Sequence, residues 1–313
     1  MNLLWLIPLC IIAFILLFSF VCFMIVFYSP KRKPLGEDEY EIPKGEIYEV
    51  YRDYMVEWAK KSRTMPHEDM CITSFDGLKL RGRYYEYSKD AVVEILFHGY
   101  RGNGERDLSG AIDRCFQLGR SALIVDQRGS GRSDGHIITF GIKERYDCLS
   151  WVDYCIKRFG NDVRIKITGV SMGAATVTMA SGMELPKNVI GVLADCGYTS
   201  PKEIIRKVLK DIKLPVFLFY PMIKLGALLY GRFDIESASP VEAIKSCKIP
   251  MLIFHGDNDA FVPVHMSEQL YEACGSDKKH ISIIKGAGHG LAFPKDREGY
   301  LDTVRKTSKE WEI

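Results

Sequence analysis

The chain begins with one long apolar run and then changes to short apolar segments separated by amphipathic ones. The run from Leu3 to Tyr28 contains no Asp, Glu, Lys or Arg, and it is longer than the roughly 20 residues that cross the hydrocarbon core of a bilayer. We therefore predict one transmembrane helix. A cleaved signal peptide is the alternative, but no basic residue precedes the run, the run is too long for such a peptide, and no A-x-A-like cleavage site follows it.

Basic residues lie on one side of this helix, and they set its expected orientation. Lys31, Arg32 and Lys33 follow the run directly, whereas no basic residue precedes it. Segments rich in Lys and Arg next to a membrane helix stay in the cytoplasm. We therefore predict a single-pass membrane protein whose remaining chain is cytoplasmic.

A linker and an amphipathic helix follow the apolar run. Residues 30–45 contain three prolines and an acidic cluster, which is typical of a linker. Apolar residues between Ile47 and Trp58 recur at helical spacing and predict a helix whose aromatic face packs on the domain. A membrane-surface role for that face is the alternative. We thus divide the chain into an anchor (1–29), the linker, and one domain (46–313).

Beyond residue 70 the hydrophobic pattern predicts a hairpin and then alternating strands and helices. The Asp-Gly pair at 76–77 separates two segments of alternating polarity, which predicts an antiparallel hairpin with a two-residue turn. After it, short apolar segments alternate with segments of helical period. This alternation specifies a mostly parallel sheet with helices on both faces, an α/β fold. The strands expected after the hairpin are 92–97, 122–125, 165–170, 189–194, 251–254 and 281–284.

One stretch, about residues 199–246, interrupts this alternation. It is too apolar for an ordinary surface loop and is broken by prolines and a glycine. We predict a small helical lid over the C-terminal edge of the sheet, lined to receive an apolar substrate group. Packing of an extra helix on the core is one alternative, and contact with the bilayer is another.

Composition and charge exclude several classes of function. Lys and Arg number 42 against 40 Asp and Glu, a net charge of +2 without a long run of either sign. This balance excludes the electrostatic footprint of a nucleic-acid-binding protein. The nine cysteines form no C-x-x-C pair and no metal-ligand spacing, and no N-x-S/T acceptor occurs, which favours a reducing compartment. We predict no nucleic-acid partner, no metal and no cofactor.

The candidate nucleophile is Ser171, the centre of the pentapeptide G-V-S-M-G at 169–173. A strand-like run precedes it and a small-residue helix follows, so the serine stands in a sharp turn that exposes its hydroxyl. A serine hydroxyl needs a histidine base that is held by a carboxylate. His289 follows the last predicted strand and Asp259 follows the preceding one. The order along the chain is therefore Ser, Asp, His.

Four further motifs accompany this turn. In chain order with it, the motifs are H-G-Y-R-G at 98–102, D-Q-R-G-S-G-R-S at 126–133, the G-V-S-M-G turn, H-G-D-N-D-A-F-V-P at 255–263, and G-H at 288–289. Together they resemble the motifs of the α/β-hydrolases, in particular the bacterial Bem46-like and serine-aminopeptidase-like (S33-type) serine hydrolases. The resemblance extends from about Met70 to the C-terminus and implies an α/β-hydrolase fold with a small lid.

The resemblance also implies roles for individual residues. Ser171 would be the nucleophile, His289 the general base and later acid, and Asp259 the carboxylate that orients the histidine. The backbone N–H groups of Tyr100 and Met172 would form the oxyanion hole.

These expectations define a membrane-anchored serine hydrolase that cleaves ester or thioester bonds of apolar, lipid-like acyl substrates through an acyl-enzyme. Asp257 is the alternative to Asp259 as the carboxylate, although only Asp259 stands at the motif position. A serine aminopeptidase is the alternative activity and would need an acidic lid residue to bind the free amine, from among Glu203, Asp211, Asp234 and Glu236. A catalytically silent, membrane-anchored binding module is the alternative of another class.

Overall fold

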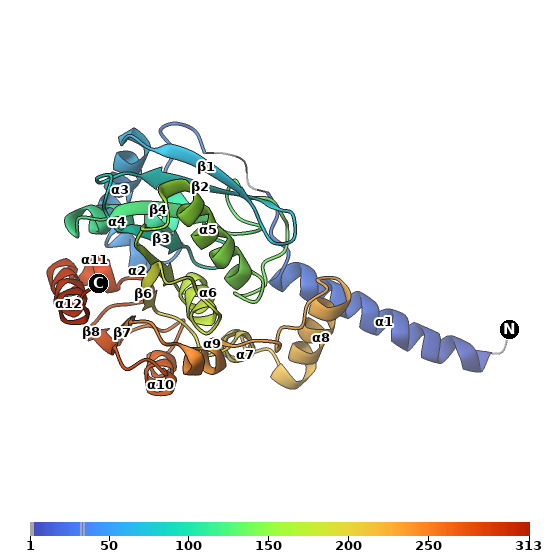
Figure 1. Ribbon diagram of the computed structural model, residues 1–313. Coiled ribbons are helices and arrows are strands. Elements are labelled where there is room, and N and C mark those ends of the chain that lie inside the picture. Colours follow the sequence, from blue (N-terminus) through green and yellow to red (C-terminus); the bar gives the residue numbers. More distant parts are fainter. Residues whose placement is uncertain (1–2, 32, 34) are drawn as a thin grey trace.

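The computed structural model describes all residues except 1–2, 32 and 34, and leaves out the side chains of residues 3–5. Arg32, one of the three basic residues behind the predicted orientation, therefore lies outside the described residues. Figure 1 shows a layered body from which one helix, α1 (Leu3–Val26), projects.

The body is built on one eight-stranded sheet in the order β1-β2-β4-β3-β5-β6-β7-β8. β1 and β2 pair with each other, and β2 pairs with β4, in antiparallel fashion, while the pairs from β4 through β8 are parallel. The predicted mostly parallel sheet is confirmed. The strands are β1 (Glu68–Thr73), β2 (Lys79–Tyr85), β3 (Val93–Phe97), β4 (Ser121–Asp126), β5 (Ile165–Val170), β6 (Val189–Asp195), β7 (Met251–Gly256) and β8 (Lys279–Ile284).

The hairpin β1-β2 has a longer turn than the sequence predicts. Thr73 pairs with Lys79 as the last register position, so the connection has five residues rather than two. The Ser74 hydroxyl accepts a hydrogen bond from the backbone N–H of Leu78 and donates one to Asp76. Side-chain hydrogen bonds of this kind offer the backbone an alternative to the strand ladder, which explains why pairing ends early.

Helices cover both faces of the sheet, as predicted (Figure 1). Since the central strands are buried on both faces, most of their positions are apolar. One face packs against α3, α4, α11 and α12, and the other against α5, α6 and α10. These helices, with the short α2, are α2 (Glu46–Glu49), α3 (Arg52–Thr64), α4 (Gly104–Gln117), α5 (Glu144–Phe159), α6 (Met172–Ser181), α10 (His265–Ala273), α11 (Ala292–Lys295) and α12 (Arg297–Trp311).

The stretch between β6 and β7 is helical, and its longest helix packs on α1. It contains α7 (Pro201–Asp211), α8 (Val216–Leu229), α9 (Pro240–Ala243) and a 3₁₀ turn, η1 (Ile244–Ser246). At the crossing of α1 and α8, a Cβ on Gly226 would lie 2.5 Å from the carbonyl oxygen of Ser19. Glycine thus lets the two helices approach closely, and the Phe18 and Phe219 rings meet beside the crossing with centroids 5.3 Å apart.

The helix α1 is long and apolar enough to cross a bilayer over residues 6–26. Its exposed side chains are almost all apolar. Membrane anchors and signal sequences share these properties, so the anchor stays a prediction.

The chain just after α1 is part of the body. Phe27 is fully buried, with its ring 5.8 Å from that of Phe140 and 5.2 Å from that of Phe233. Tyr28 forms a β-bridge with Ile137. The end of the helix is therefore fixed to the globular part by packing and backbone hydrogen bonds.

Candidate active site

Ser171 occupies a strained turn between β5 and α6. Its φ of 56° lies in the left-handed region that non-glycine residues rarely adopt, and its backbone N–H donates to the carbonyl of Asp195. Two flanking glycines make the turn possible: a Cβ on Gly173 would lie 2.0 Å from the Phe97 carbonyl oxygen, and one on Gly169 would lie 2.1 Å from the backbone of Gly173. The sequence therefore presents the serine hydroxyl at the C-terminal edge of the sheet.

His289 links this serine to a carboxylate. Its Nε2 lies 2.9 Å from the Ser171 hydroxyl oxygen, and its Nδ1 lies 2.7 Å from Oδ2 of Asp259. An ionised carboxylate only accepts, so Nδ1–H donates to Asp259 and Nε2 accepts from the serine. The structure thus brings the three predicted side chains into one hydrogen-bonded chain, from the ends of β5, β7 and β8.

The Asp259 carboxylate is held in its ionised form. Burial alone would raise its pKa, but hydrogen bonds from His255 and His289 outweigh that effect and hold the pKa well below its ordinary value. Its other oxygen, Oδ1, accepts from the backbone N–H groups of Phe261 and Val262 at 2.9 and 2.8 Å. These bonds fix the carboxylate and satisfy it inside the protein.

Asp257, the alternative carboxylate, lies elsewhere in the same loop. It is exposed, and its Oδ1 accepts from the backbone N–H of Gly286 at 2.5 Å. That bond ties the loop after β7 to the loop after β8. The geometry therefore joins His289 to Asp259.

The loop of residues 98–102 lies beside the serine. A Cβ on Gly99 would stand 3.9 Å from the Ser171 hydroxyl oxygen. The backbone N–H of Gly99 donates to Asp107 at 3.1 Å, which holds the loop in place. Tyr100, one predicted oxyanion residue, follows in this loop, and Met172, the other, directly follows the serine at the start of α6.

Tyr100 and the next residue bind the last turn of α1. The Tyr100 hydroxyl donates to the carbonyl of Val26 at 2.6 Å. The Arg101 guanidinium donates to the carbonyls of Ile25 and Tyr28 at 2.7 and 2.8 Å. The C-terminal carbonyls of a helix have no partners within the helix. Here the loop beside the serine supplies partners to that end of α1.

A cavity of about 690 Å³ opens next to Ser171 and His289. Its lining is largely apolar and includes Ile47, Tyr48, Met55, Trp58, Phe261 and Phe293. Of the described residues, none between 199 and 246 borders it. The predicted lid, residues 199–246, therefore does not line this cavity. Its longest helix, α8, packs on α1 instead. Segment 43–48 and the helix α3 line the cavity instead.

Tyr48 is a site residue that the sequence reasoning missed. Its hydroxyl donates to the backbone carbonyl of His289 at 3.0 Å, and burial, more than nearby carboxylates, raises its pKa well above the ordinary value. It belongs to α2, more than a hundred residues before the serine. Its neighbours in the sequence show only helical spacing, so no motif could have found it.

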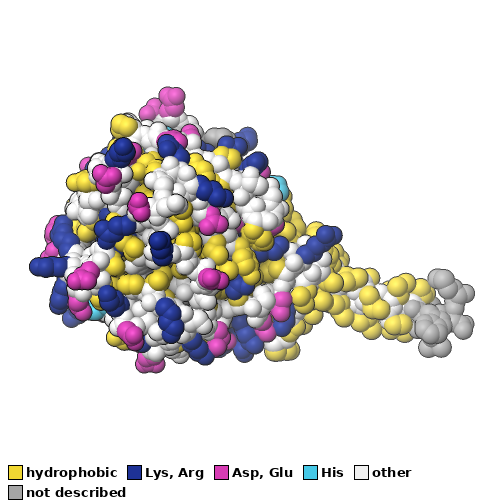
Figure 2. Space-filling model, viewed as in Figure 1, with side chains coloured by type: hydrophobic (Ala, Val, Ile, Leu, Met, Phe, Trp, Pro, Cys, Tyr) yellow, Lys and Arg dark blue, Asp and Glu magenta, His cyan; other side chains and the backbone are white. Residues whose placement is uncertain are grey.

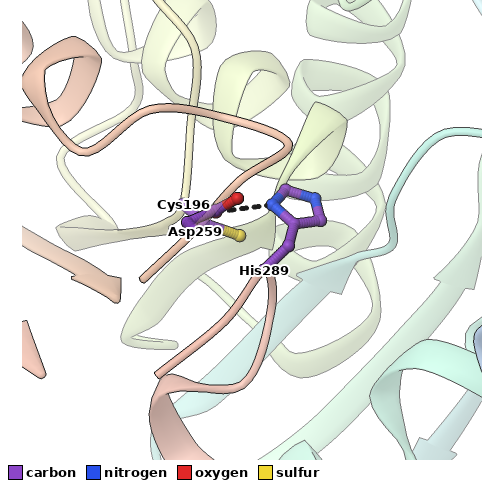
Figure 3. A group of neighbouring side chains, drawn as sticks. All are labelled: Cys196, Asp259 and His289. Atoms are coloured by element: carbon purple, nitrogen blue, oxygen red, sulfur yellow. Dashed lines mark hydrogen bonds and ion pairs between the residues drawn. The ribbon is translucent and has the colours of Figure 1, made fainter. Parts of the chain in front are cut away.

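Cys196 is a second missed neighbour. Figure 3 shows its sulfur beside the Asp259–His289 pair, and ligand atoms of the three residues lie within 4.8 Å of one another. Burial, with the nearby carboxylates of Asp195 and Asp259, raises the pKa of the Cys196 thiol well above its ordinary value. A neutral thiol is a poor metal ligand, and His289 Nδ1 already binds the carboxylate. The thiol therefore packs behind the pair.

Comparison with the sequences of known proteins agrees with the observed fold. A family model described as serine aminopeptidase, S33, matches residues 236–296, a range that includes Asp259 and His289. The Bacillus subtilis protein YqkD is 25% identical over 75% of this chain and 77% of its own. Protein bem46 of Schizosaccharomyces pombe is 26% identical over 67% and 64%. YfhR of Salmonella typhimurium is 29% identical over 70% and 73%.

Solved structures show the same fold. The Pyrococcus furiosus esterase Pf2001 superposes with a TM-score of 0.67 at 22% identity, over 89% of this chain and 99% of its own. The Pyrococcus horikoshii acylaminoacyl peptidase gives 0.58 at 19%, over 79% and 42%. The sheet order and the strained serine turn are those of the α/β-hydrolase fold. The chain is similar to α/β-hydrolases of the Bem46-like type, and the family model and the relatives support a hydrolase activity.

Proposed function

We propose that the chain is a membrane-anchored serine hydrolase that cleaves ester or thioester bonds of apolar acyl substrates. The observation that carries this proposal is the hydrogen-bonded chain Ser171–His289–Asp259 beside the largely apolar cavity of about 690 Å³. Apolar walls remove an acyl chain from water, and the polar groups at one end meet its carbonyl. The substrate therefore combines an apolar acyl group with a reactive ester or thioester.

The mechanism follows from the placement of these groups. The Ser171 hydroxyl oxygen attacks the carbonyl carbon while His289 Nε2 takes the hydroxyl proton. Asp259 stabilises the resulting imidazolium, and the N–H groups of Tyr100 and Met172 stabilise the oxyanion. The imidazolium then protonates the leaving alcohol or thiol as the bond to it breaks. A water molecule, deprotonated by His289, releases the acid from the acyl-enzyme and restores the serine.

A peptidase acting on free amino termini is the alternative activity. The family description and the acylaminoacyl peptidase neighbour favour it. Among described residues, however, the four acidic residues expected to bind the amine do not border the cavity. Three other acidic residues do border it. Asp107 accepts from the Gly99 N–H and pairs with Arg106, Asp195 accepts from the Tyr300 hydroxyl, and Glu46 is exposed. The largely apolar lining favours an uncharged acyl group.

The membrane part of the proposal rests on α1 and on the basic residues that follow it. We propose that α1 remains uncleaved as a single-pass anchor and that the body faces the cytoplasm. Protease treatment of sealed cells tests the orientation, because a cytoplasmic body stays intact until the cells are opened. Digestion from outside would contradict it.

Covalent labelling of the full chain in membranes by a fluorophosphonate probe tests the nucleophile. We expect wild type and Ser150→Ala to label equally, because Ser150 lies on α5 and its hydroxyl donates to the Tyr146 carbonyl of the same helix. Ser171→Ala should not label. Absence of wild-type labelling in the folded chain would favour the silent binding module. Parallel assays with esters of short and medium acids and with aminoacyl anilides then separate esterase from aminopeptidase.

A further inference from the structure

The outward face of α8 is apolar, which is the reverse of a helix on a soluble protein. The exposed fractions are 84% for Phe217, 45% for Leu218, 44% for Leu228 and 47% for Leu229. The single charged residue of this helix, Lys224, pairs with Glu236. A surface helix normally turns its polar face to water and its apolar face to the core. This face therefore needs an apolar partner.

We infer that this partner is the lipid bilayer, and that α8 is a second membrane-contacting element beside α1. The inference rests on the proposed anchoring of α1. It assigns the four exposed residues to the hydrocarbon of the leaflet next to the body. It also assigns the basic corner between α7 and α8 to the lipid headgroups.

Contacts between the two helices set the depth of α8. The Tyr230 hydroxyl donates to the carbonyl of Leu16, Phe219 meets Phe18, and Gly226 meets Ser19. Any 20-residue span placed within the helix α1 includes residues 7–22, and about 20 residues are needed to cross the hydrocarbon. Leu16, Phe18 and Ser19 therefore lie in the hydrocarbon for every such placement, and α8 lies beside them.

The length of α8 excludes a second crossing. Its 14 residues extend about 21 Å, which is shorter than the roughly 30 Å of the hydrocarbon core. The helix begins after Pro215, and Leu209 before it and Phe233 after it are buried in the body. Figure 2 shows hydrophobic side chains of α1 continuing onto the body where α8 lies beside it. An apolar helix in this position enters one leaflet from the side of the body.

The charges at the corner before α8 agree with this position. Lys210 and Lys213 are exposed, and so is Ile212, whose exposed fraction is 58%. Asp211, next to Ile212, pairs with Lys207. Each Lys or Arg near an anionic membrane surface contributes about 1 kcal/mol of attraction. The corner thus offers one apolar side chain to the lipid and two ammonium groups to anionic headgroups.

The test is photolabelling of the full chain in vesicles that contain a phospholipid with a diazirine in its acyl chain. The vesicles consist of phosphatidylcholine with or without phosphatidylglycerol, and labelled peptides are identified by mass spectrometry. We expect label on α1 and on 214–230, several-fold above that on the peptide containing Ile283, an exposed apolar residue of β8. Label confined to α1 would overturn the inference. So would crosslinks that pair α8 with α8 of a second copy.

Charge variants test the headgroup contact. With phosphatidylglycerol present, label on 214–230 should rise several-fold in wild type and much less in the double variant Lys210→Gln with Lys213→Gln. The matched control is Lys306→Gln with Lys309→Gln on α12, which should keep the full rise. Equal behaviour of the two pairs would refute the assignment of the corner.

The photolabelling result does not depend on catalysis. Ser171→Ala should label like wild type, so failure of the hydrolase proposal leaves this pattern unchanged. Failure of the anchoring proposal would give a different result, because α1 itself would then carry no label. In that case the inference falls with the anchor.

Discussion

The reactivity proposed for Ser171 depends on one carboxylate out of two in the same loop. Asp259 binds His289, whereas Asp257 binds a backbone N–H of the neighbouring loop. An amide in place of Asp259 would hold the histidine in the wrong tautomer and could not stabilise the imidazolium.

We predict that Asp259→Asn lowers the rate of fluorophosphonate labelling and of ester hydrolysis by about 10³- to 10⁴-fold. Asp257→Asn is the matched control and should retain most of the activity, because an amide oxygen can still accept from Gly286. The measurement is kcat and the labelling rate of the full chain in detergent. Equal losses in the two variants would contradict the assignment.

A second residue-scale prediction concerns Lys166 on β5. It is buried, with its Nζ 3.0 Å from the Ser308 hydroxyl oxygen. Burial, and after it the charge of Arg120, lowers its pKa to about 7. Between pH 7 and 10 the unfolded chain holds this proton and the folded chain does not. The free energy of unfolding therefore rises with pH in this range, and below pH 7 the buried charge destabilises the fold.

Lys166→Met removes this pH-dependent cost. We predict that the variant gains roughly 2 kcal/mol relative to wild type at pH 6, and that this difference shrinks as pH approaches 10. Urea unfolding of the detergent-solubilised chain at several pH values measures it. A difference that does not change with pH would show that the lysine is charged in the folded state throughout.

Residue patterns revealed the part of the site that follows strands. Ser171, Asp259 and His289 could be found because each follows a predicted strand, and the ends of parallel strands meet at one edge of a sheet. Tyr48 reaches the same place from α2, before the sheet begins, and Cys196 follows β6 without a recognisable motif. Their proximity to the site arises from tertiary packing, which no local spacing encodes.

At the scale of elements, the loop after β3 links the site to α1. Tyr100 uses its backbone N–H for the proposed oxyanion hole and its hydroxyl for the Val26 carbonyl. Loss of the hydroxyl frees the loop without removing the N–H group. Tyr230 makes a bond of the same kind, from its hydroxyl to the Leu16 carbonyl, at a place far along α1.

We predict that Tyr100→Phe slows acylation by up to about tenfold, the equivalent of one hydrogen bond, while Tyr230→Phe leaves the rate unchanged. Both variants lose one tyrosine hydroxyl that binds a carbonyl of α1, so general loosening of the helix would affect them alike. Stopped-flow measurement of acylation by an activated ester distinguishes the two. A slower rate in both would assign the effect to the helix as a whole.

The crossing of α1 and α8 gives another element-scale prediction. Gly226→Val places a Cβ against the Ser19 carbonyl, only 2.5 Å away in the unrelaxed geometry. Backbone at this contact cannot move aside cheaply, so we expect a loss of about 1–3 kcal/mol, measured as a lower melting temperature in detergent. Leu229→Ala, on the exposed face of the same helix, should change it little. An unchanged melting temperature for Gly226→Val would mean that the helices do not touch.

The sequence could not predict what α8 packs against. An apolar stretch of this length fits a substrate cavity, a protein core or a bilayer equally well, because the hydrophobic effect is not directional. Gly226 marks the place where α8 approaches α1 closely. A glycine in an apolar helix can be interpreted in this way only when the partner helix is known. The sheet was easier to predict because short apolar segments that alternate with amphipathic helices specify a mostly parallel sheet.

At the scale of the whole molecule, α1 and the body form one folded unit in this structure. Phe27 is buried between Phe140 and Phe233, and Tyr28 pairs with Ile137. The boundary predicted at residues 29 and 30 from composition falls just after these contacts. The end of α1 and the loop beside the serine thus share the same few contacts with the body.

This coupling predicts different effects for two N-terminal deletions. A chain that begins at residue 30 lacks Phe27 and the carbonyls that bind Tyr100 and Arg101, so we expect it to label with fluorophosphonate at least several-fold more slowly than the full chain. A chain that begins at residue 15 loses the distal part of α1 but keeps these contacts and the packing on α8, so it should label at the rate of the full chain in detergent. Circular dichroism establishes that both chains are folded. Equal labelling of the two would mean that the body needs nothing from α1 beyond attachment, because the loop would then hold its geometry without the helix.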